Sequence, residues 1–153
     1  MRLWHKDLLD SLPQKQLTAQ WRECCCIAKN IVENGTPNHI LVNKIMNYDM
    51  KHFYTYGIYV YIEMEHRDCK CDLRKFDKYF DSDVGIVKTF SELFNEFHNE
   101  WHNERYLDQC YYNIQEKFDC GAVSEEEWKK CEKKYYEMKE RYAEERNQIE
   151  GND

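Results

Sequence analysis

Glycine and proline are scarce in this sequence, which has 5 glycines and 2 prolines among 153 residues. A β-sandwich or β-barrel needs many short strands separated by turns, and these two residues are the main turn signals. No regular series of alternating segments and turn signals occurs here. The sequence therefore argues against these β folds. Its 12 tyrosines, 7 phenylalanines and 4 tryptophans set it apart from disordered acidic chains. We expect an all-α fold.

The N-terminus lacks a long apolar run. Its first ten residues, MRLWHKDLLD, include charges and do not form the uninterrupted apolar stretch of a signal peptide or a membrane span. We therefore expect a cytoplasmic protein with no membrane partner. Among the eight cysteines, Cys24, Cys25 and Cys26 are consecutive and could not easily pair with one another. We expect the thiols of this chain to be reduced.

Positive charge is also in deficit. The chain has 22 Lys and Arg against 29 Asp and Glu, a formal net charge of -7. This balance argues against generic nucleic-acid binding, in which basic residues neutralise phosphates. The deficit is uneven, because residues 1–67 hold 8 basic and 7 acidic residues and residues 68–153 hold 14 and 22. The acidity therefore lies mainly in the C-terminal half.

Helical patterns dominate the first half of the chain. Ser11, Pro13 and Gln14 predict a helix that begins near residue 12 with Ser11 as its cap. Apolar residues at helical spacing continue it to the stop at residues 34–37, where Gly35 and Pro37 lie. Residues 39–48 predict a short helix, and Asp49 caps a longer one that runs to about residue 67. A short segment at residues 73–80 follows.

The second half predicts further helices. Apolar residues Leu93, Phe94 and Phe97 indicate one segment, and the pattern from Leu107 to Phe118 indicates a helix closed by Gly121. Ser124 and Glu127 form a capping box for the last helix. One face of this helix is an apolar stripe, and charged residues flank it on both sides. The members of this apolar stripe are Trp128, Cys131, Tyr135, Met138 and Tyr142. We expect a single compact helical domain at residues 1–121 and an added charged amphipathic helix at residues 122–153, which could associate with a second chain.

Two N-terminal features indicate a function. One is the opening Met1-Arg2-Leu3-Trp4, and the other is the set Leu17, Ala19, Trp21, Arg22 and Glu23 within the first helix. Together they resemble the pyrimidine-dimer DNA glycosylase family of the endonuclease V type, in which a short extended N-terminus lies against a helix with the pattern Leu-x-Ala-x-aromatic-Arg-Glu. The resemblance continues to about Cys71 and more weakly through residues 105–118.

The resemblance implies a DNA repair glycosylase with abasic-site lyase activity. The α-amine of Met1 would attack the sugar carbon that bears the damaged base, form a Schiff base and then allow β-elimination of the 3′ phosphate. Glu23 would stabilise the cationic sugar and assist proton transfers. Arg2, Arg22 and His39 would bind DNA phosphates. The expected partner is damaged double-stranded DNA, and neither a cofactor nor a metal is implied.

The chemistry of these residue types supports that assignment independently. A peptide α-amine has a pKa of about 7.7–8.0 and a lysine about 10.4, so near neutral pH roughly a tenth of the α-amine is unprotonated against far less of a lysine. The α-amine is therefore the better nucleophile. A carboxylate beside the sugar suits an oxocarbenium-like transition state.

Three positions depart from the family pattern. Met1 stands where the family usually has a threonine exposed by removal of methionine, and the bulky Arg2 should block that trimming here. Because the α-amine and not the side chain reacts, this change is tolerable. Gln16 stands where the family has a histidine, and Cys26 where it has a second basic residue that helps to hold phosphate. Both changes remove basic side chains and so lower the expected affinity for DNA.

Other interpretations of the same residues stay open. Arg22 and Glu23 could be an ordinary solvated helix face, and His39 could have a capping or core role. His98 and His102 are spaced to share a metal, although the spacing indicates no third ligand. The chain could be a non-catalytic module that binds a nucleotide or a partner, or a structural protein that associates through its last helix. The sequence does not identify the lesion.

Overall fold

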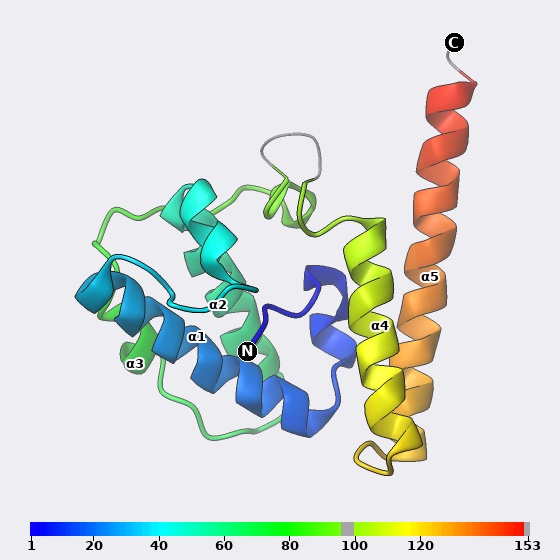
Figure 1. Ribbon diagram of the computed structural model, residues 1–153, viewed down its shortest axis with the longest axis horizontal. Coiled ribbons are helices and arrows are strands. Elements are labelled where there is room, and N and C mark those ends of the chain that lie inside the picture. The colour runs from blue at the N-terminus through cyan, green and yellow to red at the C-terminus, as the bar shows by residue number, and fades with distance from the viewer. Residues whose placement is uncertain (96–99, 152–153) are drawn as a thin grey trace.

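The computed structural model describes residues 1–95 and 100–151 (Figure 1). Within these ranges every regular element is helical, which confirms the all-α fold expected from the sequence. None of the helices in the described part of the chain is both long and apolar enough to cross a membrane. All eight cysteines are free in the structure.

The first half of the chain forms two packed helices with short helical segments around them. A 3-10 helix, η1 (Lys6–Ser11), precedes the long helix α1 (Gln14–Asn34), and η2 (Asn43–Asn47) precedes α2 (Met50–His66). Helix α1 packs against α2, and the short α3 (Arg74–Asp77) lies beside α1 (Figure 1). Gly57 of α2 faces Phe76 of α3, where an added Cβ would come within 2.2 Å of the ring. The absence of a side chain at Gly57 therefore allows α3 to dock.

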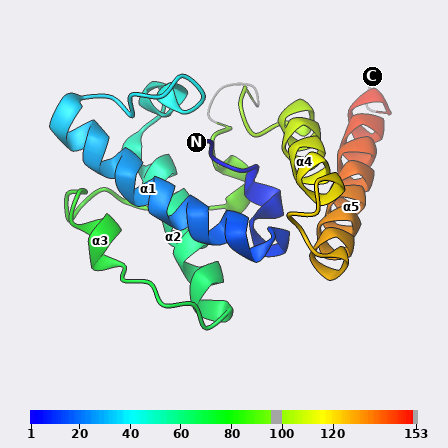
Figure 2. The same cartoon turned by 60° about the horizontal axis from the view of Figure 1, so that its bottom comes forward.

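The second half contributes an antiparallel pair of long helices. After η3 (Phe90–Glu92) come α4 (Glu104–Asp119) and α5 (Glu125–Glu150), which lie side by side in both views (Figures 1 and 2). Tyr111 and Tyr135 stack between them with ring centroids 3.7 Å apart and planes at 5°. The stripe residues Trp128, Cys131, Tyr135 and Met138 are buried. The stripe of α5 therefore packs within its own chain.

The N-terminal segment, residues 1–5, lies at the centre of the fold. It runs from the middle of the molecule to η1, which contacts both α2 and α5 (Figures 1 and 2). Leu3, Trp4 and His5 are between 0% and 6% exposed. Burial of this segment by helices from both halves of the chain fixes the place where the α-amine emerges.

Several element boundaries differ from the sequence-based expectations. Helix α1 begins at Gln14 and has no side-chain cap, because the Ser11 hydroxyl donates to the Leu8 carbonyl within η1 instead. The expected Ser11 cap is therefore wrong. Only Asn43–Asn47 of the expected helix at 39–48 is helical, and only Arg74–Asp77 of the segment at 73–80. Leu93 and Phe94 lie outside a helix, while Phe97 lies outside the described residues.

The Asp49 cap, the Ser124–Glu127 capping box and the helix closed at Gly121 are all confirmed. The capping box also has a second task. One Glu127 oxygen accepts from the Ser124 backbone at 3.1 Å, and the other accepts from the backbone N–H of Gln14 at 2.9 Å. A single carboxylate thus caps α5 and satisfies a free donor at the start of α1. It links the two helices through their N-termini.

We expect Glu127→Ala to lower the free energy of unfolding by ~1–2 kcal/mol at pH 7, the usual cost of losing a helix N-cap. Hydrogen bonding to Gln14 and Ser124 lowers the pKa of Glu127. Its contribution is therefore present above the unfolded pKa of about 4.3 and is lost as the pH falls through the folded pKa. Urea unfolding between pH 7 and pH 3 measures both effects. Glu126→Ala, at an exposed neighbouring position, is the control. Equal losses for both variants would contradict the bridging role.

Candidate active site

The α-amine of Met1 and the carboxylate of Glu23 lie together at the open end of the N-terminal segment. The Met1 nitrogen is 3.9 Å from Glu23 Oε1, and the backbone N–H of Arg2 donates to Glu23 Oε2 at 3.3 Å. The side chains of Met1 and Glu23 are 23% and 28% exposed. The pair can therefore be reached from solvent while Glu23 stays fixed to the backbone beside the amine.

Gln20, one turn before Glu23 on α1, holds the backbone that carries the amine. Its Nε2 donates to the Arg2 carbonyl at 2.9 Å, and its Oε1 accepts from the Trp4 N–H at 2.8 Å. The Tyr56 hydroxyl lies 2.7 Å from the Trp4 carbonyl and 2.9 Å from Gln20 Oε1. Burial raises the pKa of Tyr56 well above its ordinary value, so the hydroxyl keeps its proton and can donate. The extended segment is thereby fixed to α1 and α2.

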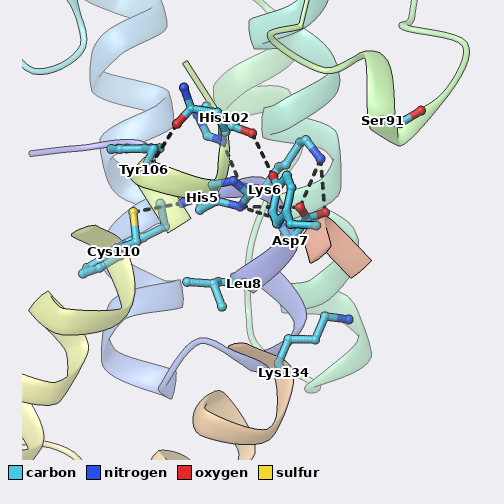
Figure 3. Close-up of polar contacts among 12 residues, drawn as sticks. His5, Lys6, Asp7, Leu8, Ser91, His102, Tyr106, Cys110 and Lys134 are labelled. Carbon is cyan, nitrogen blue, oxygen red and sulfur yellow. Dashed lines mark hydrogen bonds and ion pairs between the residues drawn. The ribbon is translucent and has the colours of Figure 1, made fainter. Parts of the chain in front are cut away.

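Residues of α4 and the segment before it hold the other side of the N-terminal segment (Figure 3). The Tyr106 hydroxyl donates to the Leu3 carbonyl at 2.5 Å. The backbone N–H of His5 donates to Cys110 Sγ at 3.3 Å, and that of Lys6 donates to His102 Nδ1 at 2.9 Å. Side chains therefore satisfy the backbone groups of this segment in place of a helix or sheet ladder.

The two buried histidines act as neutral acceptors. Desolvation by burial lowers the pKa of His5 to about 4 and that of His102 well below its ordinary value. Neutral imidazole has one nitrogen free to accept, and in each case it is Nδ1, which takes a backbone N–H from Asp7 or Lys6. These residues therefore serve to position the N-terminal segment.

The three expected phosphate-binding residues have different surroundings. Arg2 lies with its guanidinium 5.2 Å from the centroid of the Trp4 ring, directly after the amine. Arg22 precedes Glu23 on α1, is exposed, and makes no hydrogen bond or ion pair with the part of the chain that the structure describes. His39 accepts the N–H of Leu41 through Nδ1 and so has a capping role in its turn. The structure thus brings Met1, Arg2 and Glu23 together and leaves Arg22 free beside them.

A cleft of about 530 Å³ has Arg2, the residue after the amine, in its wall. Its lining combines two cations with apolar and aromatic side chains and includes no carboxylate; the lining residues are Arg2, Ile40, Leu41, Lys44, Trp101, Tyr106, Gln109 and Tyr112. The Lys44 ammonium lies 5.3 Å from the centroid of the Trp101 ring. In a chain with a net charge of -7, this cleft is a local positive region that Arg2 joins to the N-terminal amine.

The sequence reasoning missed Gln20, Lys44 and the aromatic residues from the second half. The position of Gln20 three residues before Glu23, hence on the same helix face, was the available signal for its role. No sequence signal joined Lys44 or Trp101 to Arg2, because the tertiary fold brings them together.

The histidine pair considered above as a metal site is described only in part. His98 lies outside the described residues, and His102 is occupied in binding the backbone of Lys6. In residues 1–95 and 100–151 there is no group of three or more side chains that could hold a metal ion. Cys69 and Cys71, a second pair of ligand-type residues, lie in other contacts: Cys69 accepts from Gln14, and Cys71 lies beside Glu65 with its pKa raised to about 11, mainly by desolvation.

The structure therefore defines a small helical protein with an amine–carboxylate site at its N-terminus. Residues 1–77 match the family model described as pyrimidine dimer DNA glycosylase. Because the match covers half of the chain, the chain belongs to the pyrimidine dimer DNA glycosylase family, and membership implies action on damaged DNA. The matched region contains Met1, Glu23, Gln20 and the turn at His39, whereas α4 and α5 lie beyond it. Searches among curated proteins and among solved structures found no match.

Proposed function

We propose that this protein is a glycosylase and abasic-site lyase that uses the α-amine of Met1 as its nucleophile and Glu23 as its carboxylate. The observation that carries the proposal is the 3.9 Å separation between the Met1 nitrogen and Glu23 Oε1 in a solvent-accessible site. The amine and the carboxylate can then act on the same sugar, the amine at C1′ and the carboxylate on a neighbouring atom. Family membership supplies the damaged DNA substrate.

The reaction begins with nucleophilic substitution at the sugar. The unprotonated amine forms a bond to C1′ while the bond from C1′ to the base breaks, and the base leaves with that electron pair and takes up a proton. The negative charge of Glu23 stabilises the cationic character that develops on the sugar. The amine must lose its proton before attack, and Glu23 is the nearest base.

The lyase step follows from the imine. Opening of the sugar ring breaks the bond between C1′ and the ring oxygen, which takes up a proton, and leaves a Schiff base between C1′ and the Met1 nitrogen. Removal of a proton from C2′ then expels the phosphate at C3′ and cuts the strand. Glu23 assists the proton transfers, and hydrolysis of the imine returns the free amine. No cofactor takes part in this sequence of steps.

DNA binding is assigned to the cations around the site. Arg2 and Lys44 line the cleft, and Arg22 is exposed beside Glu23, so these three side chains can contact phosphates around one sugar. His39 shapes the adjoining turn and can contribute a ring N–H. We place the protein in the cytoplasm. Self-association through α5 stays a prediction, and it would have to use residues outside the buried stripe.

A non-catalytic binding module on the same scaffold is the second candidate. It is favoured by Cys26, which is exposed where the family has a basic residue, and by the acidic C-terminal half. The salt dependence of DNA binding separates DNA-binding proteins from partner-binding proteins, because each phosphate contact steepens the loss of affinity with salt. Covalent trapping separates an enzyme from a binding module.

We expect sodium borohydride to trap a covalent complex between the protein and DNA that contains an abasic site or a pyrimidine dimer, because hydride reduces the Schiff base to a stable amine. Denaturing electrophoresis detects the complex, and mass spectrometry should place the DNA on the peptide that contains Met1. A variant with a short Gly-Ser extension before Met1 is the matched control and should give no adduct. An adduct on a lysine, or none where a known lyase gives one, would refute the proposal.

A further inference from the structure

A turn that lines the same cleft as Arg2 presents two large aliphatic side chains to solvent. Ile40 is 85% exposed and Leu41 is 49% exposed, whereas Val42 and Ile45, which follow them, are fully buried. The turn is thus anchored in the core immediately beyond its exposed tip. Ile40 is the most exposed of the large apolar side chains in the described chain. Two adjacent exposed aliphatic side chains form a small apolar patch, and such a patch can mark a binding surface.

The backbone of this turn is held in one shape by a local network. The His39 carbonyl accepts from the N–H groups of Val42 and Asn43 at 3.0 and 2.9 Å, and Asn43 Oδ1 accepts from the His39 N–H at 2.9 Å. Asn30 of α1 donates to the Pro37 carbonyl at 3.2 Å. Because so many bonds close within a few residues, Ile40 and Leu41 are presented by a preorganised support. Little conformational entropy remains to be lost on binding.

The surroundings of the turn select a polyanion as the binding partner. Ile40 and Leu41 line the same cleft as Arg2 and Lys44, and no acidic side chain lines it. Arg2, the residue directly after the proposed nucleophile, lines this cleft together with the turn. Apolar side chains framed by cations match a nucleic acid, whose bases are apolar on their faces and whose backbone is anionic.

We propose that Ile40 and Leu41 form a wedge that enters the base stack of duplex DNA at the damaged nucleotide and brings its C1′ within reach of the Met1 amine. This inference rests on the proposed function. In an intact stack the paired base and its neighbours restrict the approach of an amine to C1′, and opening a step costs a few kcal/mol. Aliphatic side chains inserted into the step replace the lost stacking contacts. Arg2 and Lys44 hold the phosphates on the two sides of the opened step.

The test compares Ile40→Ser with wild type on one DNA sequence, presented as a duplex and as a single strand, with an abasic site next to 2-aminopurine. We expect Ile40→Ser to slow borohydride trapping on the duplex at least ~10-fold, since the lost insertion no longer offsets an unstacking cost of a few kcal/mol. Trapping on the single strand, which has no stacked partner strand to open, should change less than about twofold. The rise in 2-aminopurine fluorescence on binding of the duplex should be lost as well.

Two further variants control this comparison. Ile40→Leu keeps an apolar side chain and should retain both the duplex rate and the fluorescence rise. Ile86→Ser removes an isoleucine that is 65% exposed outside the cleft, and it should behave as wild type. Circular dichroism checks that every variant is folded.

Each remaining outcome contradicts one specific statement. If wild type gives no adduct on either DNA, the proposed function fails. If wild type is trapped but Ile40→Ser slows duplex and single strand equally, or slows neither, the wedge is wrong while the proposed function stands. Absence of a fluorescence rise with wild type also overturns the wedge. If Ile40→Ser changes only the sedimentation of the protein, the turn is a protein contact and not a DNA wedge.

Discussion

Glu23→Gln is expected to reduce strand cleavage at an abasic site at least ~100-fold, the usual loss when a preorganised group that stabilises transition-state charge is removed. Glutamine is nearly the same size and can still accept from the Arg2 N–H through its amide oxygen. It lacks the negative charge that stabilises the cationic sugar, and it cannot take up a proton from the amine or from C2′. The substitution therefore removes the charge of residue 23 while it keeps the hydrogen bond that holds the side chain in place.

Single-turnover cleavage of an abasic duplex measures this effect, with urea unfolding in parallel. Because the Glu23 side chain is 28% exposed, the free energy of unfolding should change by less than ~1 kcal/mol. Glu33→Gln is the matched control, since Glu33 is also on α1 but is 54% exposed and pairs with Lys29 at 3.8 Å. A Glu23→Gln protein that cleaves within about threefold of wild type would remove Glu23 from the mechanism.

Gln20→Leu is expected to impair both stability and chemistry. Leucine has a similar volume but cannot bond to the Arg2 carbonyl, the Trp4 N–H or the Tyr56 hydroxyl. Buried polar groups left without partners cost ~1–3 kcal/mol each, and the Tyr56 hydroxyl can still bond the Trp4 carbonyl. We therefore expect the free energy of unfolding to fall by ~2–4 kcal/mol. The backbone next to Met1 would also lose its fixed position.

The measurements for Gln20→Leu are urea unfolding and the rate of borohydride trapping at a temperature where the variant is folded. Trapping should slow ~10–100-fold, since small displacements of a reacting group have effects of this size. For stability the control is Gln16→Leu, because Gln16 Oε1 is buried without a partner among the described residues and its loss should be nearly neutral. Full trapping by a folded Gln20→Leu protein would show that Gln20 is structural only.

Much of the fold followed from local patterns. The long helices α1, α2, α4 and α5 were predictable because apolar residues recur at helical spacing and because Asp49 and Ser124 are side chains that cap helices. The start of a helix was less predictable where a residue distant in the sequence supplies the capping acceptor. The N–H of Gln14 is satisfied by Glu127, which is far away in the sequence, and the local Ser11 pattern therefore misled.

The helix expected near η3 was not found. The apolar residues Leu93 and Phe94 indicated a helix, but in the structure Phe94 has a φ of 61° and packs against Trp101 and His102. Packing of aromatic rings set the backbone conformation there. A helical pattern made of only two or three apolar residues was too short to predict it.

The sequence by itself determined the helical class, the long helices and the pairing of Met1 with Glu23 as candidates, because these depend on periodicity, capping and a motif within residues 1–23. The tertiary structure decided the rest of the site. Gln20, Tyr56 and Tyr106 hold the N-terminal segment, and Lys44 joins Arg2 in one cleft, although these residues come from different helices. These contacts form because buried backbone groups need hydrogen-bond partners, and the partners come from residues distant in the sequence. A local sequence pattern cannot predict which residues they will be.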